Sequence, residues 1–149
     1  MTREETDMQL VPYLAFDGDC REAFDFYRDA FDGEIVFTMT VGESPMAAQM
    51  PPESHARLMH IELRASGASL MGADMQPGCG DGGGHHGGCV SIGLDTIEEA
   101  ERVWARLSQG ATIGMPLEPT FWATRFGMLT DRFGKAWMIN GPQLEGAQA

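Results

Sequence analysis

Lysine is almost absent from this sequence, and cysteine is scarce. Lys135 is the single lysine among ten cationic residues, which stand against 22 aspartates and glutamates for a formal net charge of −12. An acidic surface repels phosphate backbones and anionic membranes, so we expect no nucleic acid and no membrane among the partners. The three cysteines, Cys20, Cys79 and Cys89, do not form the disulfide framework of a small secreted protein, and we expect reduced thiols.

Long apolar runs are missing as well. No stretch approaches the roughly 18 apolar residues that a membrane-spanning helix requires. The first residues, 1–9, are charged and polar and lack the apolar segment of a secretory signal. We therefore expect a soluble cytoplasmic protein. With 43% hydrophobic residues in 149, the chain can bury the core of one compact domain.

The sequence does contain an internal repeat. Residues 19–23 align with 96–100 at an offset of 77, and residues 67–71 align with 134–138 at an offset of 67. Two copies of one unit, differing by a loop of about ten residues, explain both offsets. Hydrophobic periodicity gives each copy the same order of elements, β-α-β-β-β. We predict strands at 10–16, 35–41, 58–64, 69–73, 89–94, 111–117, 124–130 and 135–140, and helices at 19–33 and 96–110.

Local sequence patterns indicate where the two helices begin and end, and they also indicate one loop. Asp19 with Glu22, and Thr96 with Glu99, have the spacing of a capping box, and a glycine follows each helical pattern. Residues 42–56 hold one glycine and three prolines, which predicts a loop with a helical turn near 46–50.

A glycine-rich segment separates the copies. Eight of the twelve residues in 77–88 are glycine or proline, which predicts a flexible linker between a first unit at 10–76 and a second at 89–142. Three zinc-type donors occur there and a fourth follows it, in a C-x5-H-H-x2-C spacing that matches no zinc finger known to us. They are Cys79, His85, His86 and Cys89. We favour a linker with incidental histidines, while metal binding stays open.

Several motifs resemble the vicinal oxygen chelate superfamily of glyoxalases, dioxygenases and bleomycin-resistance proteins, in particular its PhnB-like branch. They are Phe16-Asp17-Gly18, the stretch 20–23 with Phe26-Tyr27, residues 46–52 (MAAQMPP) and residues 120–140 (TFWATRFGMLTDRFGKAWMIN). The resemblance implies an α+β fold in which curved mixed sheets form a cup, with helices outside, over a single domain at 10–142. It also implies a small-molecule ligand within the cup and a homodimer.

The resemblance further implies where a metal would bind. Metal-dependent members use His and Glu ligands at the first and last strand of each unit, and alignment puts Pro12, Met71, Cys89 and Met138 there. Proline has no side-chain donor, and thioethers are weak ligands for Mg²⁺, Mn²⁺, Ni²⁺ or Fe²⁺. We therefore expect no metal at this site and no cofactor; the methionines are interpreted as an apolar or deformable wall.

Three residues are candidates for a catalytic role. His60 and Glu62 share one face of a predicted strand. His60 could act as a general base oriented by the Glu62 carboxylate, or the two could form a structural hydrogen-bonded pair. Arg125, beside Trp122, has the chemistry of a carboxylate or phosphonate clamp, or it pairs with Asp131 or Glu118. Cys89 is interpreted as an inert thiol rather than a nucleophile.

The sequence thus favours a small-molecule-binding protein of unknown ligand that lacks the usual metal residues. The alternatives are an enzyme of lyase, isomerase or dioxygenase type with a relocated or non-metal site at His60/Glu62 or Arg125, and a scaffold whose cup holds no cavity of about 300 Å³. The predicted pocket residues are Leu14, His60, Met71, Cys89, Trp122, Arg125, Met138 and Asn140.

Overall fold

A computed structural model describes residues 8–75 and 88–144 of the chain. The first unit contains β1 (Tyr13–Phe16), α1 (Cys20–Phe31), β2 (Glu34–Thr40), β3 (Leu58–Ala65) and β4 (Ala68–Asp74). The second contains β5 (Val90–Gly93), α2 (Ile97–Leu107), β6 (Thr112–Glu118), β7 (Phe126–Thr130) and β8 (Ala136–Asn140). The predicted β-α-β-β-β order is confirmed in both units. Cys79, His85 and His86 of the predicted linker lie outside the described residues.

Each unit forms its own four-stranded mixed sheet. The strand orders are β1-β4-β3-β2 and β5-β8-β7-β6, so the two sheets have the same topology. In each, the first strand pairs in parallel with the last, and the other neighbours are antiparallel. This arrangement confirms the predicted α+β fold. None of the helices in the described ranges is long and apolar enough to cross a bilayer.

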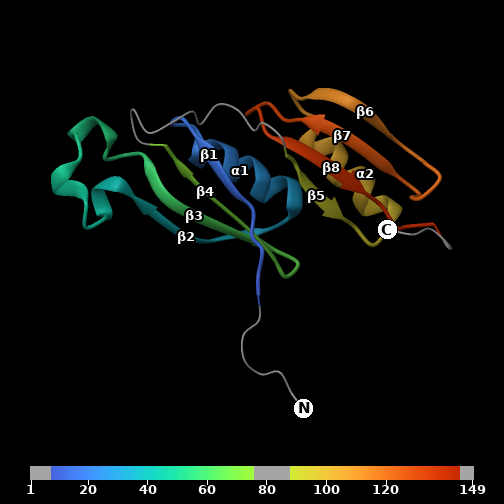
Figure 1. Cartoon of the computed structure of the whole chain (residues 1–149), viewed down its shortest axis with the longest axis horizontal. Coiled ribbons are helices and arrows are strands. Elements are labelled where there is room, and N and C mark those ends of the chain that lie inside the picture. The colour runs from blue at the N-terminus through green and yellow to red at the C-terminus, as the bar shows by residue number, and fades with distance from the viewer. Residues whose placement is uncertain (1–7, 76–87, 145–149) are drawn as a thin grey trace, which may run out of the picture.

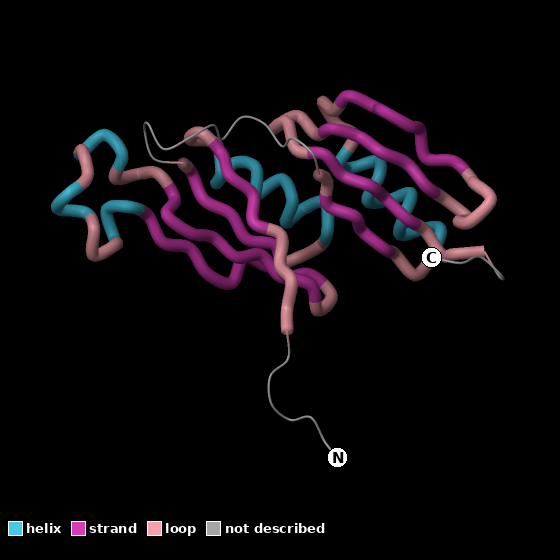
Figure 2. Tube along the Cα trace, in the orientation of Figure 1, coloured by secondary structure: helices cyan, strands magenta, loops and turns pink. Residues whose placement is uncertain are grey.

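Within residues 8–75 and 88–144, the helices cover one face of each sheet and no helix lies on the other (Figure 1). Figure 1 shows the two sheets side by side with α1 and α2 behind them, and Figure 2 shows the same layers by element type. The two helices also contact each other. In β3, Ile61 and Leu63 are buried toward the helices, while His60 and Glu62 point to the other side. We call the helix-free sides the open faces.

The start of α1 differs from the prediction. Asp19 occupies the N-cap position but makes no side-chain capping bond. The carboxylate of Asp74, at the end of β4, instead accepts the backbone N–H groups of Gly18 and Cys20 at 2.8 and 3.1 Å. The predicted cap of α2 is confirmed on one side, because the hydroxyl of Thr96 accepts the N–H of Glu99. A carboxylate from a neighbouring strand thus replaces the local cap in the first unit.

The loop between β2 and β3 has more structure than predicted. It contains three short 3₁₀ helices, Val41–Glu43, Ala47–Gln49 and Pro52–Ser54, the second of which fits the predicted turn near 46–50. A capping box that we did not predict opens the first, where Thr40 and Glu43 bond each other's backbone N–H groups.

The two units share one core, and Tyr27 of α1 lies where they meet. Its ring packs edge-on against Trp137 of β8, with 5.2 Å between ring centroids, and against Phe133 at 6.2 Å. Its hydroxyl donates to the Asp131 carboxylate at 2.6 Å, and that carboxylate also accepts Trp137 Nε1–H at 2.8 Å. Burial raises the pKa of Tyr27, and the charge of Asp131 adds to this shift. The phenol therefore stays protonated and serves as a donor.

The single lysine also joins the units. Lys135 is buried in the β7–β8 turn, its Nζ donates to the carbonyl of Ala15 in β1, and it lies 4.5 Å from the centroid of the Phe16 ring. A buried ammonium requires such acceptors because its desolvation is costly. The lone lysine is thus part of the packing between the units.

Candidate functional site

The open face of the first sheet carries a cluster of aromatic side chains. The strand register places Tyr13 of β1 beside Met71 of β4, Met71 beside Glu62 of β3, and Glu62 beside Phe37 of β2. Tyr13 and Phe37 are 53% and 44% exposed, large fractions for such side chains. The ring of His60 lies between them, with centroids 5.6 Å from Tyr13 and 5.7 Å from Phe37. We call Tyr13, Phe37 and His60 the aromatic wall.

Two polar pairs accompany the aromatic wall. The Tyr13 hydroxyl lies 2.9 Å from His60 Nδ1, and burial raises the pKa of Tyr13. Arg64 Nε donates to Glu62 at 3.1 Å. His60 and Glu62 thus share the open face, as predicted, but each has its own partner, a tyrosine and an arginine respectively. Sequence reasoning missed Tyr13, which the alternation of β1 could have placed on this face.

The open face of the second sheet carries a row of methionines. Met115 of β6 pairs with Met128 of β7, and Met128 pairs with Met138 of β8. Ser91 of β5 lies beside Met138 at the end of the row. Side chains of directly paired residues lie on the same face, about 5 Å apart at Cβ. We call Met115, Met128 and Met138 the methionine row. Of the three, sequence reasoning identified Met138 alone.

The predicted residues Asn140 and Trp122 lie at one end of this face. Asn140 pairs with Phe126 across β7 and β8, and its amide donates to the Ser91 hydroxyl at 2.9 Å. Trp122, in the loop before β7, packs edge-on against Phe126 with 5.2 Å between centroids. The second face therefore combines thioethers, two aromatic rings and a small polar pair.

Arg125 does not share this face. It lies one residue before Phe126, so strand alternation directs it toward the helices, where its Nε donates to Glu101 of α2 at 3.2 Å. The prediction that it pairs with Asp131 or Glu118 is wrong, because Asp131 is buried beside Tyr27 and Glu118 lies on the open face beside Phe126. Because Arg125 points toward α2, its place in the predicted pocket is also corrected.

Leu14 is also directed away from the open face. Its side chain is 3% exposed and belongs to the core beneath α1. Strand alternation gives the open face to its neighbour Tyr13 instead. The prediction that the Leu14 side chain faces the cup is therefore corrected, although Leu14 does border, with Cys89, a hollow where β1 and β5 begin.

The four positions aligned with metal ligands are divided between the two sheets. Met71 and Met138 lie on the two open faces, where their direct strand partners are Tyr13 and Ser91 rather than Pro12 and Cys89. Pro12 and Cys89 instead line an open hollow of about 460 Å³ where β1 and β5 begin. The side chains at the aligned positions are two thioethers, a thiol and a proline ring; the carboxylate beside Met71, Glu62, accepts a hydrogen bond from Arg64. This donor set does not fit a hard divalent cation, which prefers imidazole and carboxylate groups.

The two described thiols have different environments. Cys20 is fully buried at the start of α1, and its burial raises the pKa of the thiol well above the ordinary range. Cys89 is exposed, just before β5. A buried neutral thiol is a poor nucleophile, so Cys20 has a packing role.

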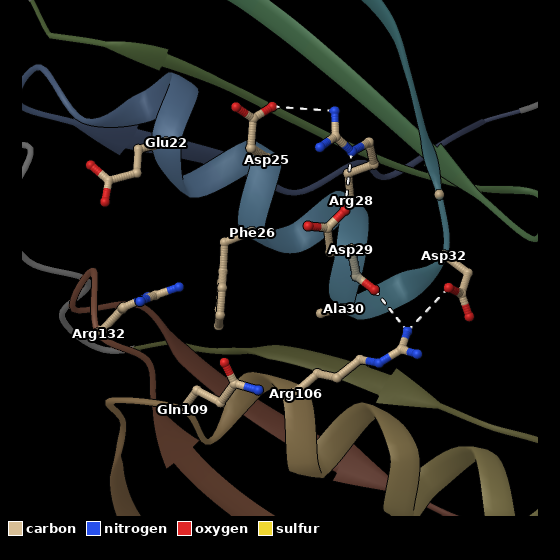
Figure 3. Close-up of a pocket in the computed structure, with 11 residues that line it drawn as sticks. Glu22, Asp25, Phe26, Arg28, Asp29, Ala30, Asp32, Arg106, Gln109 and Arg132 are labelled. Atoms are coloured by element: carbon tan, nitrogen blue, oxygen red, sulfur yellow. Dashed lines mark hydrogen bonds and ion pairs between the residues drawn. The ribbon is translucent and has the colours of Figure 1, made fainter.

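A second, larger hollow lies on the helix side. It has a volume of about 850 Å³ and runs between α1 and the end of α2, as Figure 3 shows. Charged side chains in this hollow pair with one another. Arg106 donates to the Asp32 carboxylate and to the carbonyl of Asp29, and its hydrogen bond to Asp32 holds the pKa of Asp32 below its ordinary value. Arg132 lies 4.2 Å above the ring of Phe26. None of the residues predicted to bind a ligand lines this groove, and its contacts join the two helices.

Comparisons of the chain with a family model, with known sequences and with solved structures agree with one another. A model of the Glyoxalase/Bleomycin resistance protein/Dioxygenase superfamily matches residues 9–139. Protein YjdN of Escherichia coli K12 is 33% identical over 143 residues, covering 89% of this chain and 95% of that protein. The crystal structure of protein PA1353 from Pseudomonas aeruginosa is 40% identical, with a TM-score of 0.82, covering 91% of this chain and 98% of that one. A PhnB protein from Bacillus cereus shares the fold at 24% identity and a TM-score of 0.69, covering 90% and 99%.

Proposed function

The chain belongs to the Glyoxalase/Bleomycin resistance protein/Dioxygenase superfamily, and from this premise we propose that it binds a small organic molecule on its open sheet faces. The observation that carries the proposal is the exposure of large apolar side chains on both faces. Tyr13 and Phe37 on the first sheet and Met115 on the second are 44–53% exposed. Exposed apolar surface of this kind, with a few convergent polar groups, is typical of binding sites.

We propose that a second copy of the chain completes the site. The two helices lie on the same side of the two sheets, so both open faces point away from the helices (Figure 1). Within one chain they cannot enclose a ligand from opposite sides. A homodimer that places the first sheet of one protomer over the second sheet of its partner would close two cups, each with an aromatic wall and a methionine row.

In this proposal the ligand is bound without a metal at the aligned positions. The reason is the chemistry of Pro12, Met71, Cys89 and Met138, together with the strand partners Tyr13 and Ser91. Binding then depends on shape, apolar contact and the polar groups of the two faces. The hollow of about 460 Å³ at Pro12 and Cys89 also favours a binding role over a scaffold with a filled cup.

A charged residue in the middle of the methionine row tests this proposal. We expect Met128→Glu to lose both dimer and ligand, because it places a carboxylate within an apolar contact. Native mass spectrometry of the protein purified from its own cell would report subunit count and retained ligand together. Gln109→Glu adds the same charge on the exposed helix side and is the matched control. Binding at the open faces would be contradicted if both variants retained a ligand. It would also be contradicted if neither the variants nor the parent protein retained one.

A second candidate function is catalysis at His60. The observation that favours it is the hydrogen bond between Tyr13 and His60 on an accessible face, since a histidine oriented by a partner can act as a general base. Once a substrate is identified, His60→Ala is then expected to lower turnover by about 100-fold or more with the far-ultraviolet circular dichroism unchanged. Unaltered turnover in this variant would refute a catalytic role for His60 and leave binding as the function.

A further inference from the structure

We propose that the natural ligand is a flat aromatic molecule without negative charge, held between the aromatic wall and the methionine row. This inference rests on the proposed function, and it goes further by naming the chemical class of the ligand. Three features of the open faces carry it: the spacing of the rings on the first sheet, the thioethers on the second, and the charge of both.

The aromatic wall is a surface for a planar ring. Tyr13 and His60 are stacked with 30° between their ring planes, and their hydrogen bond fixes this arrangement. Phe37 lies on the far side of His60 at 50° to it. Together they present ring faces and edges across the first sheet, from β1 at one edge to β2 at the other. Aromatic pairs gain about 0.5–1.5 kcal/mol beyond the burial of their area, and an extended planar ligand makes several such contacts at once.

Methionine is concentrated on the same faces. The register places five of the eleven methionines there, namely Met39, Met71, Met115, Met128 and Met138. A thioether is polarisable and makes favourable contacts with aromatic rings, and its unbranched side chain adapts to ligands of different outline. Aliphatic ligands would be served equally well by leucine or isoleucine. The choice of methionine opposite an aromatic wall therefore favours a ring system.

The charge of the open faces disfavours an anion. In the strands of the described ranges the only arginine is Arg64, and it bonds Glu62. Lys135, the single lysine, is buried between the units. Glu118 lies on the second open face beside Phe126, and the whole chain carries a net charge of −12. An uncharged or cationic ring is compatible with these surroundings, and a cation gains from the negative ring faces.

Three probes of related size separate these features. They are 9-aminoacridine, a planar cation; acridine-9-carboxylate, an anion on the same ring; and 1-adamantylamine, a cation that is not planar. Isothermal titration calorimetry with the full chain is expected to give 9-aminoacridine an affinity about tenfold or more above that of each other probe. Tyr13→Ala and Met115→Ala are each expected to weaken it severalfold. Met46→Ala is the matched control, because Met46 is as exposed as Met115 but lies in the β2–β3 loop.

Failure of this inference is distinguishable from failure of the proposed function. Equal affinities for the three probes, preference for the anion, or no binding of 9-aminoacridine would overturn the ligand class. So would a stoichiometric aliphatic or anionic molecule on the protein from its own cell, although that result would support a binding function. An equal loss of affinity in Met46→Ala and Met115→Ala would also overturn the assignment to the open faces.

Discussion

Replacement of Asp131 by alanine is expected to lower the free energy of unfolding by about 3–4 kcal/mol. The Asp131 carboxylate accepts four hydrogen bonds, which come from the Tyr27 hydroxyl, the Trp137 indole and the backbone N–H groups of Phe133 and Lys135. Alanine would leave these donors without their acceptor in a site where Asp131 is 3% exposed. Each unsatisfied buried donor costs about 1–3 kcal/mol, and water that enters the site and accepts from these donors would reduce the total cost.

Urea unfolding followed by tryptophan fluorescence would measure this effect. Asp29→Ala is the matched control, because the Asp29 side chain is 76% exposed and its partner Arg28 is on the same helix. Its effect is expected to stay within about 0.5 kcal/mol. The link between the units through Asp131 would be refuted if the two variants unfolded at the same urea concentration.

Gly72→Ala is expected to cost about 2–3 kcal/mol of stability, because α1 lies directly on this glycine of β4. A Cβ atom there would lie 2.7 Å from the ring of Phe24 and 2.8 Å from the carbonyl oxygen of Leu14. Phe24 is fully buried, and Leu14 belongs to the strand paired with Gly72. Neither neighbour can move without disturbing the helix or the β1–β4 pairing.

The matched control is Gly93→Ala in β5, where an added Cβ would meet nothing within 4 Å. Its effect on the free energy of unfolding is expected to stay within about 0.5 kcal/mol. Thermal unfolding by circular dichroism compares the two variants directly. If Gly72→Ala were as stable as Gly93→Ala, helix α1 would not lie as close to β4 as described here.

Sequence patterns predicted the order of elements well because they are local. The repeat and the two hydrophobic periods depend on neighbouring residues, so they place strands and helices to within a few positions. The alternation in β3 likewise predicts that His60 and Glu62 share one face. The register was less predictable: one residue decides whether Leu14 or Tyr13 lies on the open face, and where Arg125 points.

Contacts between distant residues could not be predicted. The bond from Tyr27 to Asp131 spans 104 positions, and nothing local to either residue specifies it. Asp74 replaces the expected cap of α1 from 54 positions away. The methionine row also requires the pairing of three strands, which a single sequence does not supply. The residues that join the units and line the open faces are therefore those that sequence reasoning missed.

The position of Tyr27 has a consequence for how the chain is made. During translation α1 leaves the ribosome more than one hundred residues before Asp131 and Trp137, which together surround the Tyr27 ring and hydroxyl. Until then the nascent first unit carries an aromatic surface whose natural cover has not been synthesised. The two βαβββ units have the same topology but are thus not equivalent, because the earlier one is completed by the later.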